Sequence, residues 1–193
     1  EFGFPVFDLP NLDVVLEIRQ LLDIELRKHI RDPEVQLETY HHFINSDDEH
    51  IDIHWKIASA ARDQKFTRQV LEGQLEILHD FFGPDLAMSS RDNVRIVRPQ
   101  VESDNLDFHR DYDYGNTAFE LNILVPFVDV DELTGLAVLP KSHLMEDNEL
   151  DIVDTDHPTV KKGSLKHRLG FMHSPKIIRN LSLDDAVTPS VKV

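Results

Sequence analysis

Apolar residues recur every three or four positions in two long stretches of the first half of the chain, the period of an α-helix that buries one face. In the first stretch the repeat is carried by Val14, Ile18, Leu22, Leu26 and Ile30. Asn11 stands where an N-cap residue is expected, and Pro33 prevents the helix from continuing. This pattern predicts a helix over residues 12–30.

A second helix is predicted over residues 64–82, followed by Gly83 and Pro84, which end it. Its apolar face consists of Phe66, Val70, Leu71, Leu75, Leu78 and Phe82. Gly73 lies inside this stretch and weakens its helical character. Between the two stretches, residues 34–61 carry four histidines and the acidic run 47–49, and we expect one or two short helices there.

After Pro84 the chain changes to short runs of β-branched and apolar residues, which are typical of strands. The runs are 94–98, 120–128, 136–139, 152–153, 176–178 and 191–193, with a turn expected at 131–135. Helices followed by short strands predict an α+β protein in which helices back a β-sandwich or barrel. We expect a single domain over 1–193, helical over 1–90 and β-rich over 91–193, with further strands after Val193.

Composition and charge narrow the possible partners. The 193 residues carry a formal net charge of −16, which disfavours binding to nucleic acid or to an anionic membrane surface. The chain has no cysteine, which excludes thiolate metal sites and a cysteine nucleophile. No apolar run is long enough for a membrane span, and the first residues do not have the pattern of a signal peptide. We therefore expect a cytoplasmic protein.

The strongest candidate for chemistry is the segment 108–115, Phe-His-Arg-Asp-Tyr-Asp-Tyr-Gly. His109 and Asp111 are two residues apart, so on an extended backbone their side chains leave the same face. An imidazole and a carboxylate supply two ligands of the 2-His-1-carboxylate triad that holds non-haem Fe(II). A bare His-x-Asp pair also occurs by chance in solvated loops, so the motif alone does not establish a metal site.

The order of the surrounding landmarks adds to this motif. They are Arg-Ile-Val-Arg-Pro at 95–99, Glu-Leu-Asn at 120–122, Thr-Gly-Leu at 134–136 and Pro-Lys-Ser-His at 140–143. With the His-x-Asp motif, this series resembles the phytanoyl-CoA dioxygenase superfamily, and within it the streptomycin-biosynthesis-type branch. The resemblance implies a double-stranded β-helix, which is a jelly-roll or cupin-like fold. It also implies Fe(II) as the metal and 2-oxoglutarate as the co-substrate.

By this resemblance His109 and Asp111 bind the metal and Asn122 contacts 2-oxoglutarate, although a hydrogen bond inside the barrel is an alternative for Asn122. Arg98 could bind the anionic co-substrate or substrate, and a surface arginine is the alternative. Tyr112 and Tyr114 could line the substrate mouth or pack the loop on the sheet edge. For the residue between the two ligands, at position 110, we expect a structural ion pair.

Two departures from the family pattern concern the second half of the chain. The family's distal histidine and its 2-oxoglutarate-binding arginine are expected on strands after a segment like 191–193. Residues 147–190 are long for the branch and include the basic cluster 161–168, which by analogy would form a lid. The other histidines, His143 and His173 in this half and His50 and His54 before it, are expected to be surface or packing residues, without a separate zinc site.

The sequence thus predicts an Fe(II)- and 2-oxoglutarate-dependent dioxygenase that uses O₂ to oxidise a C–H bond of a small-molecule substrate. A cupin-like binding protein without turnover, lacking the distal histidine and arginine, is the alternative. A hydrolase or isomerase that uses another metal at the same two ligands is a third interpretation.

Overall fold

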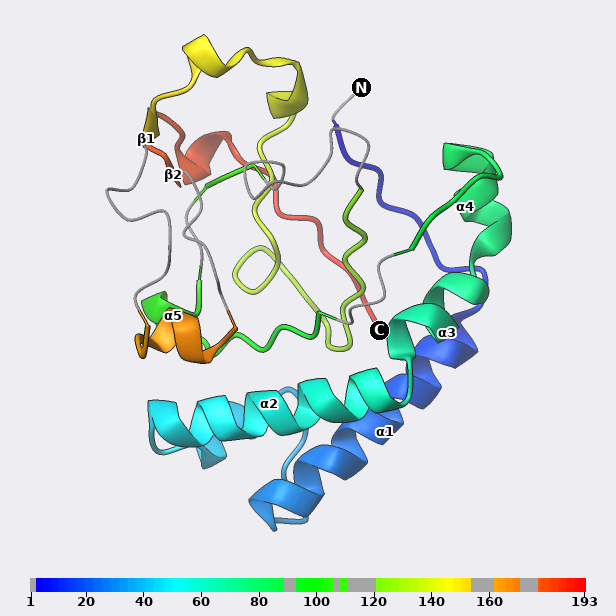
Figure 1. Cartoon of the computed structure of the whole chain (residues 1–193), viewed down its shortest axis with the longest axis vertical. Coiled ribbons are helices and arrows are strands. Elements are labelled where there is room, and N and C mark those ends of the chain that lie inside the picture. Colours follow the sequence, from blue (N-terminus) through cyan, green and yellow to red (C-terminus); the bar gives the residue numbers. More distant parts are fainter. Residues whose placement is uncertain (1–2, 89–92, 106–107, 111–120, 154–161, 171–176) are drawn as a thin grey trace. The chain divides into compact units, whose positions relative to one another are not determined.

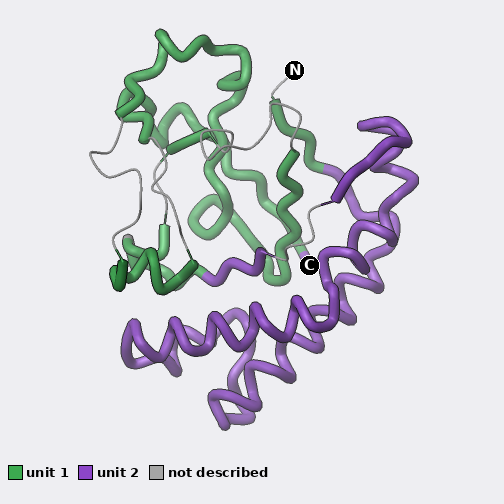
Figure 2. The backbone as a smooth tube through the Cα atoms, viewed as in Figure 1, with its two compact units in different colours: residues 1–6, 97–192 green, residues 7–96, 193 purple. Residues whose placement is uncertain are grey.

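The computed structural model describes residues 3–88, 93–105, 108–110, 121–153, 162–170 and 177–193. The chain divides into two compact units (Figure 2). The helical unit is formed by residues 7–96 with Val193, and the second unit by residues 1–6 and 97–192. The sequence pattern predicts that the chain changes from helical to β-rich at residue 90, near this division.

The helical unit begins with α1, Leu12–Ile30, which confirms the first predicted helix (Figure 1). Its buried residues are Val15, Ile18, Leu22 and Leu26, and three of these belong to the predicted stripe. The first and last residues of that stripe, Val14 and Ile30, are half-buried. The helix ends at Arg31 in a left-handed conformation, whose backbone N–H donates to the Arg27 carbonyl 3.0 Å away.

The expected cap at Asn11 is wrong, because its side chain makes no capping hydrogen bond. Instead the backbone of Asn11 is held by the side chain of Gln74. Gln74 Nε2 donates to the Asn11 carbonyl over 2.9 Å, and the Asn11 N–H donates to Gln74 Oε1 over 3.2 Å. Gln74 is only 3% exposed, so the start of α1 is tied to a buried amide 63 residues later.

The region between the predicted helices contains the 3-10 turn η1, Tyr40–Phe43, and the helix α2, Asp47–Asp63. At 17 residues α2 is longer than the short helices expected there. Ser46 caps it by accepting a hydrogen bond from the Glu49 N–H over 3.2 Å. The acidic run 47–49 occupies the first turn, where negative charge stabilises the positive end of the helix dipole.

The second predicted helix is two helices in the structure, α3 over Phe66–Glu72 and α4 over Leu75–Phe82. The break falls at Gly73 and Gln74, where the buried amide of Gln74 turns to the start of α1. Both α2 and α3 pack against α1 (Figure 1). The apolar core of the unit comes from Val15, Ile18, Leu22, Leu26, Val35, Ile51, Ile57, Phe66, Val70 and Leu78.

The second unit contains the strands β1, Ile152–Val153, and β2, Ile177–Ile178, and these confirm two of the predicted runs. They pair antiparallel with Ile152 opposite Ile178. Two isolated antiparallel bridges pair Val130 with Val191 and Val138 with Val187, and one partner of each, Val191 and Val138, falls on a further predicted run. Among the described residues, 94–98 and 121–128 carry no assigned strand, and these two predicted runs stay predictions. The double-stranded β-helix stays a prediction.

The other described elements of this unit are short. They are the helix α5, Leu165–Arg168, and the 3-10 turns η2 (Glu102–Asp104), η4 (Ser142–Leu144), η5 (Asp147–Glu149) and η6 (Leu183–Asp185). The predicted turn at 131–135 is present. Gly135 N–H donates to the Asp131 carbonyl over 2.9 Å, and Asp131 Oδ1 accepts from the N–H groups of Leu133 and Thr134. Among the described residues, no helix has the length and apolar character needed to cross a bilayer.

Candidate functional site

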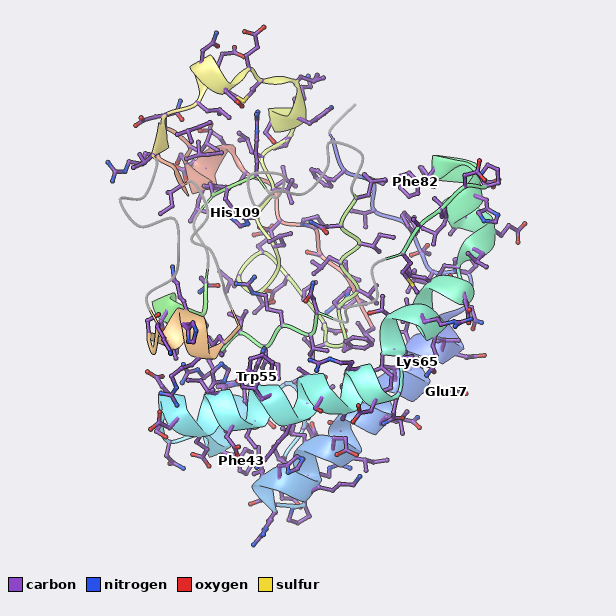
Figure 3. The ribbon with its side chains drawn as sticks, viewed as in Figure 1. Glu17, Phe43, Trp55, Lys65, Phe82 and His109 are labelled. Atoms are coloured by element: carbon purple, nitrogen blue, oxygen red, sulfur yellow. The ribbon has the colours of Figure 1, made fainter. Side chains whose placement is uncertain are left out.

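The described part of the His-x-Asp motif is the segment 108–110. His109 is half-buried in the second unit (Figure 3). The carbonyl of Phe108, directly before it, accepts a hydrogen bond of 2.9 Å from the backbone N–H of Ile178 in β2. Asp111, Tyr112 and Tyr114 lie outside the described residues, so their assignments as metal ligand and substrate-lining residues stay predictions.

The guanidinium of Arg110 reaches a segment more than thirty residues later. One terminal nitrogen donates to the carbonyls of Ser142, at 2.7 Å, and Met145, at 2.8 Å. The other donates to Asp147 Oδ1 at 2.7 Å, which confirms the ion pair expected for residue 110. The Ser142 carbonyl also accepts from the Met145 N–H, so the guanidinium caps the end of η4.

Arg98 is buried, and the alternative of a surface arginine is wrong. Its Nε and one terminal nitrogen donate to the two carboxylate oxygens of Asp104, each over 2.8 Å. Its backbone N–H donates to the same carboxylate over 3.0 Å. The Asp104 side chain is 0% exposed, so the pair forms a desolvated fork-to-fork contact. The described contacts thus engage Arg98 with a carboxylate of the protein, and its binding of the co-substrate stays a prediction.

Sequence reasoning missed Asp104. The signal that could have found it is the turn after Arg98. Pro99 follows directly, Gln100 has a left-handed φ of 62°, and η2 begins at residue 102. This local reversal brings a carboxylate six residues later back to the arginine.

Asn122 lies in the second unit and is exposed. The stretch 121–128 around it carries no assigned strand, and Leu121 and Leu124 beside it are also exposed. The alternative of a hydrogen bond inside a barrel stays open. Its contact with 2-oxoglutarate stays a prediction.

Of the remaining histidines in this unit, His143 lies exposed in η4 and His173 is outside the described residues. The imidazole of His143 lies directly against Gly3, which adopts a positive φ of 93°. A side chain at residue 3 would collide with this ring, so His143 acts here as a packing residue. Within the basic cluster, 162–168 is described and includes α5, and its role as a lid stays a prediction.

His50 and His54 lie one turn apart on α2 in the helical unit, and both are buried. The Tyr40 hydroxyl is 2.7 Å from His50 Nδ1, and Tyr40 is itself buried. This agrees with packing within the helical core. In the same region burial, and to a lesser degree the neighbouring His42, lower the pKa of His41 below its ordinary value.

One of the two ligands assigned in this chain is described, and its chemistry fits Fe(II). His109 offers an imidazole, a ligand that suits iron, and its two flanking positions are both anchored. Among the described residues no group of three or more histidines and carboxylates lies close enough to hold a metal ion. Asp111, the other ligand that the resemblance assigns in this chain, is outside those residues.

Comparison with known proteins identifies no relative, since no protein-family model, curated protein or solved structure matches the chain.

Proposed function

We propose that this protein is an Fe(II)- and 2-oxoglutarate-dependent dioxygenase that oxidises a C–H bond of a small-molecule substrate. The observation that carries the proposal is the ordered series of sequence landmarks from Arg95 to His143, centred on the His-x-Asp motif. One contact supports reading these landmarks as a single site. Arg110, inside the first motif, bonds to the carbonyl of Ser142, inside Pro-Lys-Ser-His.

His109 and Asp111 would hold the metal, together with a further histidine that the family supplies from a later strand. When bound, Fe(II) with 2-oxoglutarate supplies an O₂-dependent oxidation that releases succinate and CO₂. The protein's own contribution is orientation. The carbonyl of Phe108 bonds to β2, and the side chain of Arg110 bonds to the segment 142–147, so the residue between them is anchored on both sides.

The proposal is tested on the full-length protein by anaerobic titration with Fe(II) and 2-oxoglutarate, followed through the weak visible charge-transfer band of the ternary complex. We expect the band in the wild-type protein and its loss in His109→Ala. His79→Ala is the matched control, because His79 is exposed on α4 in the helical unit. Succinate formation under O₂ should follow the same order.

The outcomes separate the three readings of the sequence. No band and no succinate in the wild-type protein would overturn the dioxygenase proposal and favour a cupin-like binding protein. A bound metal without succinate would favour a hydrolase or isomerase at the same ligands. A band that persists in His109→Ala would show that the assigned ligand is wrong.

A further inference from the structure

Two sequence landmarks of the proposed site are joined through one side chain. Arg110 directly follows the metal-ligand candidate His109, and its guanidinium bonds to the carbonyls of Ser142 and Met145. We propose that Arg110 is a positioning residue, which locks the His109 segment to the 142–147 turn so that the imidazole keeps one orientation. The role toward the metal rests on the proposed function, whereas the lock itself does not.

The two carbonyl bonds carry most of this lock. The Arg110 side chain is 15% exposed, whereas its carboxylate partner Asp147 is 65% exposed. An ion pair with so exposed a partner is weakened by solvent and salt. A charged donor that bonds to a carbonyl in a part-buried place makes the stronger contact. Removal of the Asp147 charge should therefore matter less than removal of the guanidinium.

The geometry favours arginine over lysine at this position. One terminal nitrogen serves two carbonyls while the other faces the carboxylate, and all three bonds are between 2.7 and 2.8 Å. The planar guanidinium presents its N–H groups in a fixed fork, whereas an ammonium is a point charge on a flexible stem. Lysine should keep the charge at residue 110 and lose most of the lock.

A second anchor acts on the other side of His109. The Phe108 carbonyl accepts from the N–H of Ile178, a buried residue of β2. The chain is thus held immediately before the histidine by backbone and immediately after it by a side chain. Contacts that orient a ligand from outside the first coordination sphere typically change metal affinity by about 10- to 100-fold when they are removed.

The test uses Arg110→Met and Arg110→Lys, with Asp147→Asn to remove only the ion pair. Arg68→Met is the matched control, because Arg68 makes an exposed pair with Glu72 on α3, in the other unit. Hydrogen exchange is measured on the metal-free, full-length proteins, in peptides that cover 141–150 and 177–179. Binding of Mn(II), a redox-stable probe for the Fe(II) site, is measured in the presence of 2-oxoglutarate.

For Arg110→Met we expect exchange in 141–150 to rise about tenfold or more and Mn(II) affinity to fall about 10- to 100-fold. Arg110→Lys should give exchange and Mn(II) affinity between those of this variant and the wild type. If Arg110→Met does not fold, both quantities are measured on Arg110→Lys instead. Asp147→Asn should change either quantity by less than about fivefold. Arg68→Met should match the wild type.

If hydrogen exchange in 141–150 is the same in Arg110→Met as in the wild-type protein, the lock is overturned. An effect of Asp147→Asn as large as that of Arg110→Met would also overturn it, because the ion pair would then carry the contact. Raised exchange with unchanged Mn(II) affinity would overturn the positioning role. If the wild-type protein binds no Mn(II), the proposed function and the role toward the metal fall together, and the exchange data still decide the lock.

Discussion

The buried pair of Arg98 and Asp104 gives the sharpest prediction about stability. The carboxylate of Asp104 accepts three hydrogen bonds from Arg98, two from the guanidinium and one from the backbone N–H. The side chains are 9% and 0% exposed. Asp104→Ala would remove all three acceptor contacts at once and leave the buried guanidinium without the carboxylate that neutralises it.

The expected cost follows from this burial. Removal of one partner from a buried ion pair destabilises a protein by about 3–5 kcal/mol, mainly because a desolvated charge remains. At about 1.4 kcal/mol per factor of ten, the opened form of the segment should be at least 100-fold more populated. When Arg98→Met is combined with Asp104→Ala, no charge remains. The double variant should then cost only about 1–3 kcal/mol, for the backbone N–H that has lost its acceptor.

The choice of assay is dictated by where the probes lie. Trp55 is on α2 (Figure 3), and the long helices also belong to the helical unit, so tryptophan fluorescence and far-ultraviolet circular dichroism follow that unit. Hydrogen exchange in peptides that cover 97–105 reports the ion pair directly. Asp129→Ala is the matched control, since its pair with Lys192 is exposed and should cost less than about 1 kcal/mol.

Two results would contradict the reasoning about this pair. If Asp104→Ala keeps exchange protection in 97–105 within about threefold of the wild type, the contact does not have the energy of a buried ion pair. A double variant less stable than Asp104→Ala would contradict the attribution of the cost to the remaining charge.

Two further predictions concern the turn at 131–135 and the histidines of η1. Gly135→Ala should destabilise the protein by about 1–3 kcal/mol, because a Cβ there would lie 2.6 Å from a Thr188 methyl and 2.9 Å from a backbone oxygen. Gly73→Ala is the control for the same thermal unfolding experiment. Its new contacts would all be 3.4 Å or longer, so it should be tolerated. Burial, and to a lesser degree His42, lower the pKa of His41 in the folded protein. As the pH falls, His41 is therefore protonated at a higher pH in the unfolded state than in the folded state, and stability decreases as the pH drops through about 6.5. His42→Gln should raise the pKa of His41 and reduce this loss, and an unchanged proton NMR titration of His41 would contradict it.

Local signals explain why α1 could be predicted from the sequence to the residue. Its apolar repeat lies within the helix, and Pro33 follows three residues after its end. The length of α2 was missed because its buried face includes His50 and His54, which a hydropathy pattern counts as polar. Gly73 gave a local signal for the break between α3 and α4, but the contact of Gln74 with a partner 63 residues earlier lies outside any local window.

The same distinction between local and distant partners applies to the candidate site. The ion pair of Arg110 could be expected from its place between two ligand candidates, but its carbonyl partners 32 and 35 residues later could not. The burial of Arg98 could not be predicted, because it depends on whether a carboxylate reaches the arginine away from water, and Asp104 does so through the turn at 99–100. Strand pairing, such as that of Val130 with Val191, is likewise decided by distant partners.

The contact between Gln74 and Asn11 also limits how early the helical unit can fold during synthesis. Closing a loop of 63 residues costs about 4 kcal/mol of chain entropy by the logarithmic rule, so the contact has to form together with the packing of the helices around it. During synthesis at about 5–20 residues per second, Gln74 is made about 3–13 s after Asn11. During that interval the start of α1 at Asn11 is without the buried amide of Gln74. The helical unit can therefore complete its folding only after Gln74 has left the ribosome.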